Sequence, residues 1–179
     1  MSAPDWPAAL LQKAGPIRLV VFDIDGVMTD GRLFRDDNGH EIKAFHSRDG
    51  LGMKALIRHG FTLAALTARH SKLVRVRMAE LGIEHLVQGR EDKGEAFEEL
   101  LQQTAIDASR AAYMGDDLVD WPAMRRAELK LCPGDGDSWV RRQADYVTAA
   151  GGGRGAVREV CELLLEANGW LDAWRNSFR

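Results

Sequence analysis

Short apolar runs alternate along the chain with segments of helical periodicity. Four runs are almost uninterrupted by polar residues: Ile17–Phe22, Thr62–Leu66, Ala111–Met114 and Leu129–Cys132. A strand that is apolar on both sides is buried on both faces, as in a parallel sheet whose connections are helices. Weaker runs at Ile83–Val87 and Tyr146–Thr148 would extend the same sheet. The pattern therefore predicts an α/β fold, a Rossmann-like parallel sheet with helices on both faces.

Three helices between or after these runs have recognisable ends. Ser71 is expected to cap the first helix and Gly82 to end it. The inward stripe of this helix is expected to consist of Leu73, Val74, Met78 and Leu81. Apolar residues at helical spacing predict a second helix over Lys93–Thr104 and a third over Ala156–Asn168.

One segment after the first strand breaks this alternation. Arg32–Arg35 and Glu41–Phe45 flank the turn-rich Asp36–Gly39 and predict a β-hairpin over about residues 32–46. The hairpin carries apolar side chains that it cannot bury alone. We therefore expect it to pack against another subunit, with the body of its own chain as the alternative.

The composition is that of one ordinary globular domain over residues 1–179, with 45% hydrophobic residues, 28% charged residues and a net charge of −3. A chain of this length needs no disulfide for stability, and Cys132 and Cys161 are expected to be free thiols in a reducing cytoplasm. The mixed charges argue against nucleic-acid or anionic-membrane partners. The chain start lacks a signal-peptide pattern, and no apolar stretch approaches the ~18 residues that suggest a membrane span. We therefore expect a cytoplasmic protein with a small-molecule partner.

Polar residues follow the apolar runs at the points where strands should end. Asp23 and Asp25 follow the first run, Thr67 the second and Asp116 the third, while Lys93 opens the helix between the second and third. Ligands of an open parallel sheet bind beyond the carboxyl ends of its strands, so these side chains should share one crevice. Taken singly, each has a simpler interpretation as a turn, a cap or a surface residue. Their succession at strand ends favours a site.

Three carboxylates in one crevice repel each other unless a cation lies between them. Oxygen ligands with room for water and a phosphate oxygen favour Mg²⁺ over Zn²⁺, whose usual Cys and His ligands are missing at these positions. The Thr67 hydroxyl and the Lys93 ammonium suit the oxygens of a phosphoryl group. The sequence therefore predicts a phosphoryl-transfer site, in which a carboxylate can act as nucleophile.

The segments DIDGVMTDG, LTAR, the Lys93 position and GDDLVD resemble, in this order, the four motifs of the haloacid dehalogenase superfamily. The hairpin segment, FHSRDGLG, GDDLVDWPAM and ADYVTAAGGGRGAVREVCELLLEANG resemble a branch of that superfamily that lacks a cap domain, over roughly residues 17–170. Only about 36 residues separate Asp30 from Thr67, which leaves no room for a separate cap at this point.

The resemblance implies a role for each acidic residue. Asp23 would attack phosphorus, and Asp25 would protonate the leaving sugar oxygen and then deprotonate the water that cleaves the aspartyl-phosphate. Mg²⁺ would be held by the carboxylates of Asp23 and Asp116 and by the backbone carbonyl of Asp25. Asp120 would steady Lys93.

The resemblance also implies a substrate and an assembly. The substrate would be 3-deoxy-D-manno-octulosonate 8-phosphate, a precursor of lipopolysaccharide. Asp117 would lie behind the metal ligands. Substrate contacts are expected from Asp25, His46, Ser47, Arg48, Asp49, Gly50, Lys54, Arg69, Arg77 and Lys93. A homotetramer would cover the open site with a neighbour's C-terminal segment. Arg154, within the glycine run of residues 151–155, would belong to that cover or to a flexible connector.

Three other functions compete with this interpretation. A nine-carbon sugar acid 9-phosphate presents a similar carboxylate and phosphate, and assaying the two esters side by side would separate them. A receiver-type signalling module also uses Asp, Thr, Lys and Mg²⁺, but its acceptor Asp follows the third strand and it lacks an acid two residues from that Asp. A non-catalytic oligomeric scaffold is disfavoured because every motif acid and Lys93 are present.

Overall fold

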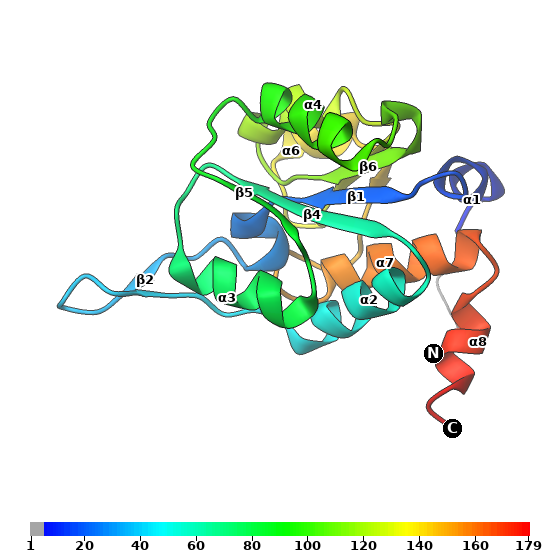
Figure 1. Cartoon of the computed structure of the whole chain (residues 1–179), viewed down its shortest axis with the longest axis horizontal. Coiled ribbons are helices and arrows are strands. Elements are labelled where there is room, and N and C mark those ends of the chain that lie inside the picture. Colours follow the sequence, from blue (N-terminus) through cyan, green and yellow to red (C-terminus); the bar gives the residue numbers. More distant parts are fainter. Residues whose placement is uncertain (1–5) are drawn as a thin grey trace.

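The computed structural model describes residues 6–179, which contain a six-stranded parallel sheet (Figure 1). Across the sheet the strands are β5 (His85–Gln88), β4 (Thr62–Thr67), β1 (Leu19–Phe22), β6 (Ala111–Met114), β7 (Leu129–Cys132) and β8 (Tyr146–Val147). The central strand β1 pairs in parallel with β4 on one side and β6 on the other. The strand order reverses beside β1, which is where an open parallel sheet forms its ligand crevice.

Helices cover both faces of the sheet, and the predicted α/β fold is confirmed. One face packs against α1 (Ala8–Ala14), α2 (Ser47–Arg58), α3 (Lys72–Leu81), α7 (Ala156–Ala167) and α8 (Leu171–Asn176). The other face packs against α4 (Lys93–Thr104), α5 (Trp121–Met124) and α6 (Ser138–Gln143). Figure 1 shows α4 and α6 on one side of the strands and α2 and α7 on the other. Within residues 6–179 no inserted domain caps the sheet, and no helix combines the length and apolar character needed to cross a bilayer.

The predicted helices form with small differences. Lys93–Thr104 has the predicted bounds, and α3 ends at Gly82, whose φ of +78° lies in the left-handed region. The Ser71 side chain makes no capping hydrogen bond; its backbone N–H donates to Oε1 of Gln88 at 2.7 Å. The prediction for Leu73 was wrong, because this side chain is 41% exposed whereas the rest of its stripe is buried. Leu73 precedes the first buried residue of the stripe and so points about 100° away from it.

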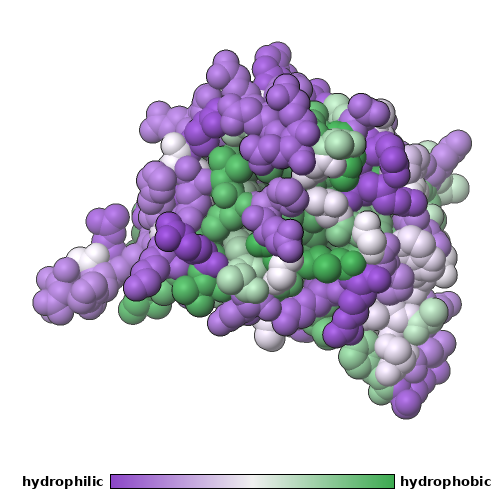
Figure 2. All heavy atoms as spheres, in the orientation of Figure 1, coloured by the Kyte–Doolittle hydropathy of each residue, from purple (hydrophilic) through white to green (hydrophobic). Residues whose placement is uncertain are grey.

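The predicted hairpin is present, but its paired strands are shorter than expected. β2 (Phe34–Arg35) and β3 (Glu41–Ile42) pair antiparallel over two residues each. The hairpin extends away from the body of the molecule, as Figure 1 shows, and its outer end is hydrophilic (Figure 2). The side chains of Leu33, Phe34 and Ile42 are 54%, 47% and 58% exposed. Its apolar surface therefore lies largely open within a single chain.

The turn that follows β1 spans Ile24–Met28. The glycine run of residues 151–155 packs against this turn. The Gly153 N–H donates to the carbonyl of Val27 at 2.9 Å, and the Gly152 N–H donates to Oδ1 of Asp135 at 2.8 Å. A Cβ atom on Gly152 would overlap the carbonyl of Gly26. The run therefore supports the turn through close backbone contact that only glycine permits.

Candidate active site

A cleft of about 170 Å³ lies at the carboxyl edge of the sheet. Its lining comes from the ends of β1, β4 and β6 and from the start of α4: Asp23, Asp25, Thr67, Ala68, Arg69, Lys93, Asp116, Asp117 and Val119. Parallel strands end at a common edge, so residues more than 40 positions apart in the chain meet there. The cleft brings together the four residues expected to be catalytic and the expected third carboxylate.

Lys93 joins two buried carboxylates at the base of the cleft. Its Nζ donates to Oδ1 of Asp23 and to Oδ1 of Asp120, each at 2.6 Å. The side chains of Lys93, Asp23 and Asp120 are 2%, 6% and 0% exposed. Lys93 is the first residue of α4. It reaches this position because α4 packs against the face of the sheet on which Asp120 lies. The contact expected between Asp120 and Lys93 is present.

Asp120 uses both of its oxygens to organise the loop after β6. Its Oδ1 also accepts from the Tyr113 hydroxyl at 3.0 Å, and its Oδ2 accepts from the backbone N–H groups of Asp116 and Asp117 at 3.1 and 3.3 Å. Sequence reasoning missed Tyr113, which appears in the chain only as an apolar member of a buried strand. Its side chain is fully buried, so its hydroxyl requires the partner that Asp120 supplies.

Burial and mutual repulsion raise the pKa values of the carboxyl groups. Burial, with the nearby charge of Asp120, raises the pKa of Asp23 to about 7, although Lys93 opposes the shift. Burial and the charges of Asp120 and Asp23 raise the pKa of Asp116 to about 8. Burial alone would lower the pKa of Lys93, but Asp23 and Asp120 raise it, so Lys93 stays a cation. The single positive charge of Lys93 therefore does not neutralise the negative charge of the carboxylates in the cleft.

The donor set fits a hard divalent cation. Asp23, Asp116 and Asp120 each place a carboxylate oxygen within 4.8 Å of the others. Both oxygens of Asp120 already accept hydrogen bonds, which leaves Asp23 and Asp116 as the better-placed ligands. Gly26, at φ +102°, allows Asp116 to approach, since a Cβ atom there would overlap the Asp116 carboxylate. An oxygen-only cluster with excess negative charge suits Mg²⁺.

Thr67 and Arg69 form the wall of the cleft at the end of β4. Thr67 is buried, and its Oγ1 accepts from the backbone N–H of Arg69 at 3.3 Å. The Arg69 guanidinium donates through Nη2 to Oε1 of Glu41 at 2.6 Å, and its Nε lies 3.7 Å from Oδ2 of Asp25. The Thr67 hydroxyl and the Arg69 guanidinium therefore face the carboxylates of Asp23 and Asp25 across the cleft.

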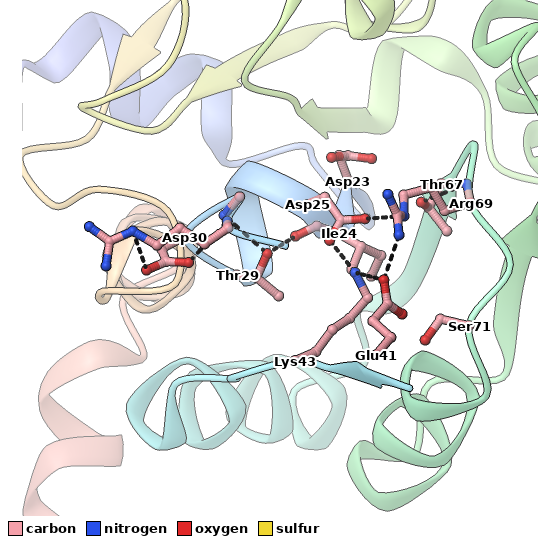
Figure 3. A network of polar contacts seen from close by, with 12 residues as sticks. Asp23, Ile24, Asp25, Thr29, Asp30, Glu41, Lys43, Thr67, Arg69 and Ser71 are labelled. Atoms are coloured by element: carbon pink, nitrogen blue, oxygen red, sulfur yellow. Dashed lines mark hydrogen bonds and ion pairs between the residues drawn. The ribbon is translucent and has the colours of Figure 1, made fainter. Parts of the chain in front are cut away.

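The hairpin contributes two residues that sequence reasoning missed, Glu41 and Lys43 (Figure 3). Lys43 donates a hydrogen bond to Oδ1 of Asp25, and its Nζ lies 3.5 Å from Oε1 of Glu41. In an extended segment, residues two apart point to the same side, so Glu41 and Lys43 both point toward the body of the molecule while Ile42 faces outward. This alternation is visible in the sequence, but nothing there shows which side of the hairpin meets the body.

The other residues expected to touch substrate lie outside the cleft of their own chain. They are His46, Ser47, Arg48, Asp49, Gly50, Lys54 and Arg77. Asp49 is buried against α7, where its Oδ1 accepts from the Arg158 N–H at 2.9 Å, and Lys54 is exposed. The Arg77 guanidinium lies 5.8 Å from the centre of the Phe45 ring. Their substrate contacts stay a prediction.

Arg154 also lies away from the catalytic cleft. Its Nη2 is 3.7 Å from Oδ2 of Asp30, and its side chain is 60% exposed. With Arg48 and Arg158 it lines a separate hollow of about 310 Å³ at the start of α7. Its predicted role as an active-site cover stays a prediction.

Comparison with known proteins assigns the family. Residues 61–157 match the model of the haloacid dehalogenase-like hydrolases, and a relative 47% identical to the chain matches 92% of it. The chain belongs to the haloacid dehalogenase-like hydrolases. That relative is the 3-deoxy-D-manno-octulosonate 8-phosphate phosphatase KdsC of Escherichia coli strain K12, of which 88% is covered. The order of the four motif positions agrees with this family.

Solved structures of two similar proteins resemble the whole fold. The 3-deoxy-D-manno-octulosonate 8-phosphate phosphatase of Yersinia pestis is 44% identical, with a TM-score of 0.90 over 92% of this chain and 89% of that one. The phosphatase of the same name from Moraxella catarrhalis is 43% identical, with a TM-score of 0.93 over 96% of this chain and 98% of that one. The Moraxella structure contains a magnesium ion, a phosphate ion and a KDO molecule.

Proposed function

We propose that this protein is a Mg²⁺-dependent phosphatase that hydrolyses 3-deoxy-D-manno-octulosonate 8-phosphate to the free sugar acid and phosphate. The single observation that carries the proposal is the meeting of Asp23, Asp116 and Lys93 in one cleft. The names of the relatives, and the ligands bound to the Moraxella enzyme, support the substrate. The product would serve as a precursor of lipopolysaccharide.

The first step transfers the phosphoryl group to the protein. A carboxylate oxygen of Asp23 forms a bond to phosphorus while the bond from phosphorus to the sugar oxygen breaks. Asp25 gives its proton to that oxygen, which would otherwise leave as a poorly stabilised alkoxide. Lys93 fixes the orientation of Asp23 through their 2.6 Å hydrogen bond, and Thr67 offers its hydroxyl to a phosphoryl oxygen.

The second step releases phosphate and restores the protein. Asp25, now ionised, takes a proton from a water molecule as that water attacks phosphorus. The bond between phosphorus and Asp23 breaks, and both carboxyl groups return to their starting state. When bound by the carboxylates of Asp23 and Asp116 and the backbone carbonyl of Asp25, Mg²⁺ would offset the negative charge that the phosphoryl group adds to the site.

Assembly is part of the same proposal. The whole chain would act as one phosphatase domain in the cytoplasm, as a homotetramer in which a neighbour completes each open cleft. Arg154 and the C-terminal segment would then meet the substrate of another subunit, while His46–Gly50, Lys54 and Arg77 would belong to the substrate contacts that the assembly completes. The exposed hairpin and the position of these residues outside their own cleft support this arrangement. Arg69 would pair with the sugar acid carboxylate, for which its planar guanidinium is suited.

Phosphate release from two esters tests the proposal. The eight-carbon 3-deoxy sugar acid 8-phosphate and a nine-carbon sugar acid 9-phosphate are assayed side by side, with Mg²⁺ and with EDTA. We expect Mg²⁺-dependent release, faster for the eight-carbon ester, and loss of turnover by at least about 10⁴-fold in Asp23→Asn. Preference for the nine-carbon ester would change the substrate. Turnover retained by a folded Asp23→Asn variant would refute the mechanism. Release of phosphate from neither ester by the unmodified protein would leave the receiver-type alternative to be tested.

A further inference from the structure

We propose that Lys43, on the hairpin, is a positioning residue that fixes the carboxylate of Asp25 for its two proton transfers. The inference rests on the proposed function, because it assumes that Asp25 exchanges protons with the sugar oxygen and with water. It adds a contribution from a segment that carries none of the four family motifs. Lys43 itself does not line the cleft and would act through Asp25.

The first argument is burial. The Lys43 side chain is only 2% exposed, whereas most lysines lie at the surface with their ammonium groups in water. A buried ammonium is unfavourable unless carboxylates pair with it. Lys43 has two such partners, Asp25 and Glu41, and Asp25 belongs to the cleft. A lysine held so close to the catalytic turn restricts the side chain that it contacts.

The second argument is the unequal state of the two Asp25 oxygens. Oδ1 accepts the hydrogen bond from Lys43. Oδ2 is buried without a hydrogen-bond partner, and the Arg69 Nε lies 3.7 Å away. Buried carboxylate oxygens without partners are rare and call for an explanation. Occupation of Oδ1 by Lys43 leaves Oδ2 as the oxygen available for proton exchange.

The third argument is the way the hairpin is attached. Glu41 accepts from Arg69 at 2.6 Å while Lys43, just after β3, contacts Asp25, so two adjacent polar contacts join the second arm of the hairpin to the cleft (Figure 3). The paired part of the hairpin is only two residues per strand, and its apolar side chains Leu33, Phe34 and Ile42 are exposed. The base of the hairpin is therefore held in part by the same residues that contact the proposed proton-transfer group.

The variant Lys43→Met tests this role, because it removes the ammonium and keeps the length of the side chain. Lys43→Arg is the conservative variant. Lys72→Met is the matched control, since Lys72 is exposed and forms no ion pair among residues 6–179. Turnover is measured with the eight-carbon sugar acid phosphate, and 4-nitrophenol release is followed from 4-nitrophenyl phosphate in the pre-steady state. The second ester has a leaving group that needs no protonation.

We expect Lys43→Met to lower kcat for the sugar acid phosphate by about 10-fold or more, with KM changed by less than about 2-fold. With 4-nitrophenyl phosphate we expect a rapid burst of about one 4-nitrophenol per site, as phosphorylation of Asp23 proceeds, followed by slowed turnover. Lys43→Arg should recover at least part of the lost kcat. Lys72→Met should match the unmodified protein in both assays.

Several results would overturn the inference. One is a kcat within about 2-fold of the unmodified protein for both esters. A raised KM at unchanged kcat would make Lys43 a substrate contact, and loss of the burst would make it a support for Asp23. If Lys43→Met does not fold, Lys43→Arg decides, because full loss of turnover in a folded Lys43→Arg also contradicts a positioning role that a second cation can fill. An inactive unmodified protein would refute the proposed function itself, whereas the Lys43 variants alone cannot.

Discussion

At the floor of the cleft, one lysine faces three carboxylates. Lys93 contacts Asp23 and Asp120, while Asp116 lies close enough to share a cation with them. Asp120 is fully hydrogen-bonded and stays paired with Lys93, whereas the pKa values of Asp23 and Asp116 rise to about 7 and 8. The remaining negative charge is the feature that makes the site suitable for Mg²⁺ and for a phosphoryl group.

These shifts predict how stability depends on pH. Folding raises the pKa values of Asp23 and Asp116, so the folded protein without metal binds protons more tightly than the unfolded chain. Their contribution to the free energy of unfolding is fully present below the ordinary pKa of 3.8 and is lost as pH rises through about 7 and 8. We therefore expect urea unfolding in EDTA to show this contribution falling between pH 5 and pH 8, at ~1.4 kcal/mol for each pKa unit crossed as an upper limit.

The variant Asp116→Asn is the control for this dependence, since it removes one of the two titrating groups. The difference between the unmodified protein and Asp116→Asn should shift in favour of the variant as pH rises. Mg²⁺ at a fixed concentration, about 100 times its Kd at pH 8, should add about 2.7 kcal/mol to the free energy of unfolding at pH 8 and less at pH 5, where protons compete for the carboxylates. A difference between the two proteins that is flat from pH 5 to pH 8 would contradict the raised pKa of Asp116.

At the scale of elements, the turn after β1 depends on a distant glycine run. Gly152 and Gly153 lie against the backbone of Gly26–Thr29, between the start of α7 and the residues that carry the carboxylate pair. The turn that follows β1 is therefore held by a segment far along the chain from it. This contact gives the run a structural purpose within one chain, besides its expected role as an active-site cover.

The variant Gly152→Ala should disturb this contact. Its Cβ atom would overlap the Gly26 carbonyl, so the turn must shift, and we expect a loss of about 1–3 kcal/mol in the free energy of unfolding together with reduced kcat. Gly15→Ala is the control, because Gly15 has φ −57° and its nearest neighbour would be 3.5 Å from the new Cβ atom. Thermal unfolding and phosphate release measure both effects. Equal behaviour of the two variants would mean that the run does not support the turn.

The sequence predicted the parallel sheet well because its strands are short apolar runs separated by helical segments. Ala111–Met114 and Leu129–Cys132 have the predicted bounds. The motif residues also met as expected, since all follow strand ends on one edge. Lys43, Glu41 and Tyr113 were missed because their importance depends on contacts across the chain, which periodicity does not report. Leu73 was misplaced because an apolar residue beside a buried stripe can still face solvent.

At the scale of the whole molecule, the cleft is open and the hairpin is exposed. Leu33, Phe34 and Ile42 form an uncovered apolar surface at the hairpin, and seven of the expected substrate contacts lie outside the cleft of their own chain. Monomeric proteins seldom leave such groups uncovered without a partner. Both features agree with a neighbour that packs on the hairpin and completes the site.

Light scattering after gel filtration tests this assembly. We expect a mass near four times the 19.9 kDa of one chain. The double variant Phe34→Glu, Ile42→Glu should dissociate the assembly, because charges would enter an apolar interface. The control is Trp139→Glu, which places a charge on an exposed aromatic residue of α6, away from the hairpin and the C-terminal segment. A monomeric unmodified protein would contradict the tetramer and the expected cover of each site by a neighbour's C-terminal segment.

The most direct test of the central claim is a single turnover with substrate labelled in its phosphate group. The reaction is run with Mg²⁺, quenched in acid and digested, and the labelled peptide is identified by mass spectrometry. We expect the phosphoryl group on the peptide that contains Asp23, at the side chain of Asp23, and no labelled peptide from Asp23→Asn. Phosphate formed by the unmodified protein with the label on another residue would contradict the account.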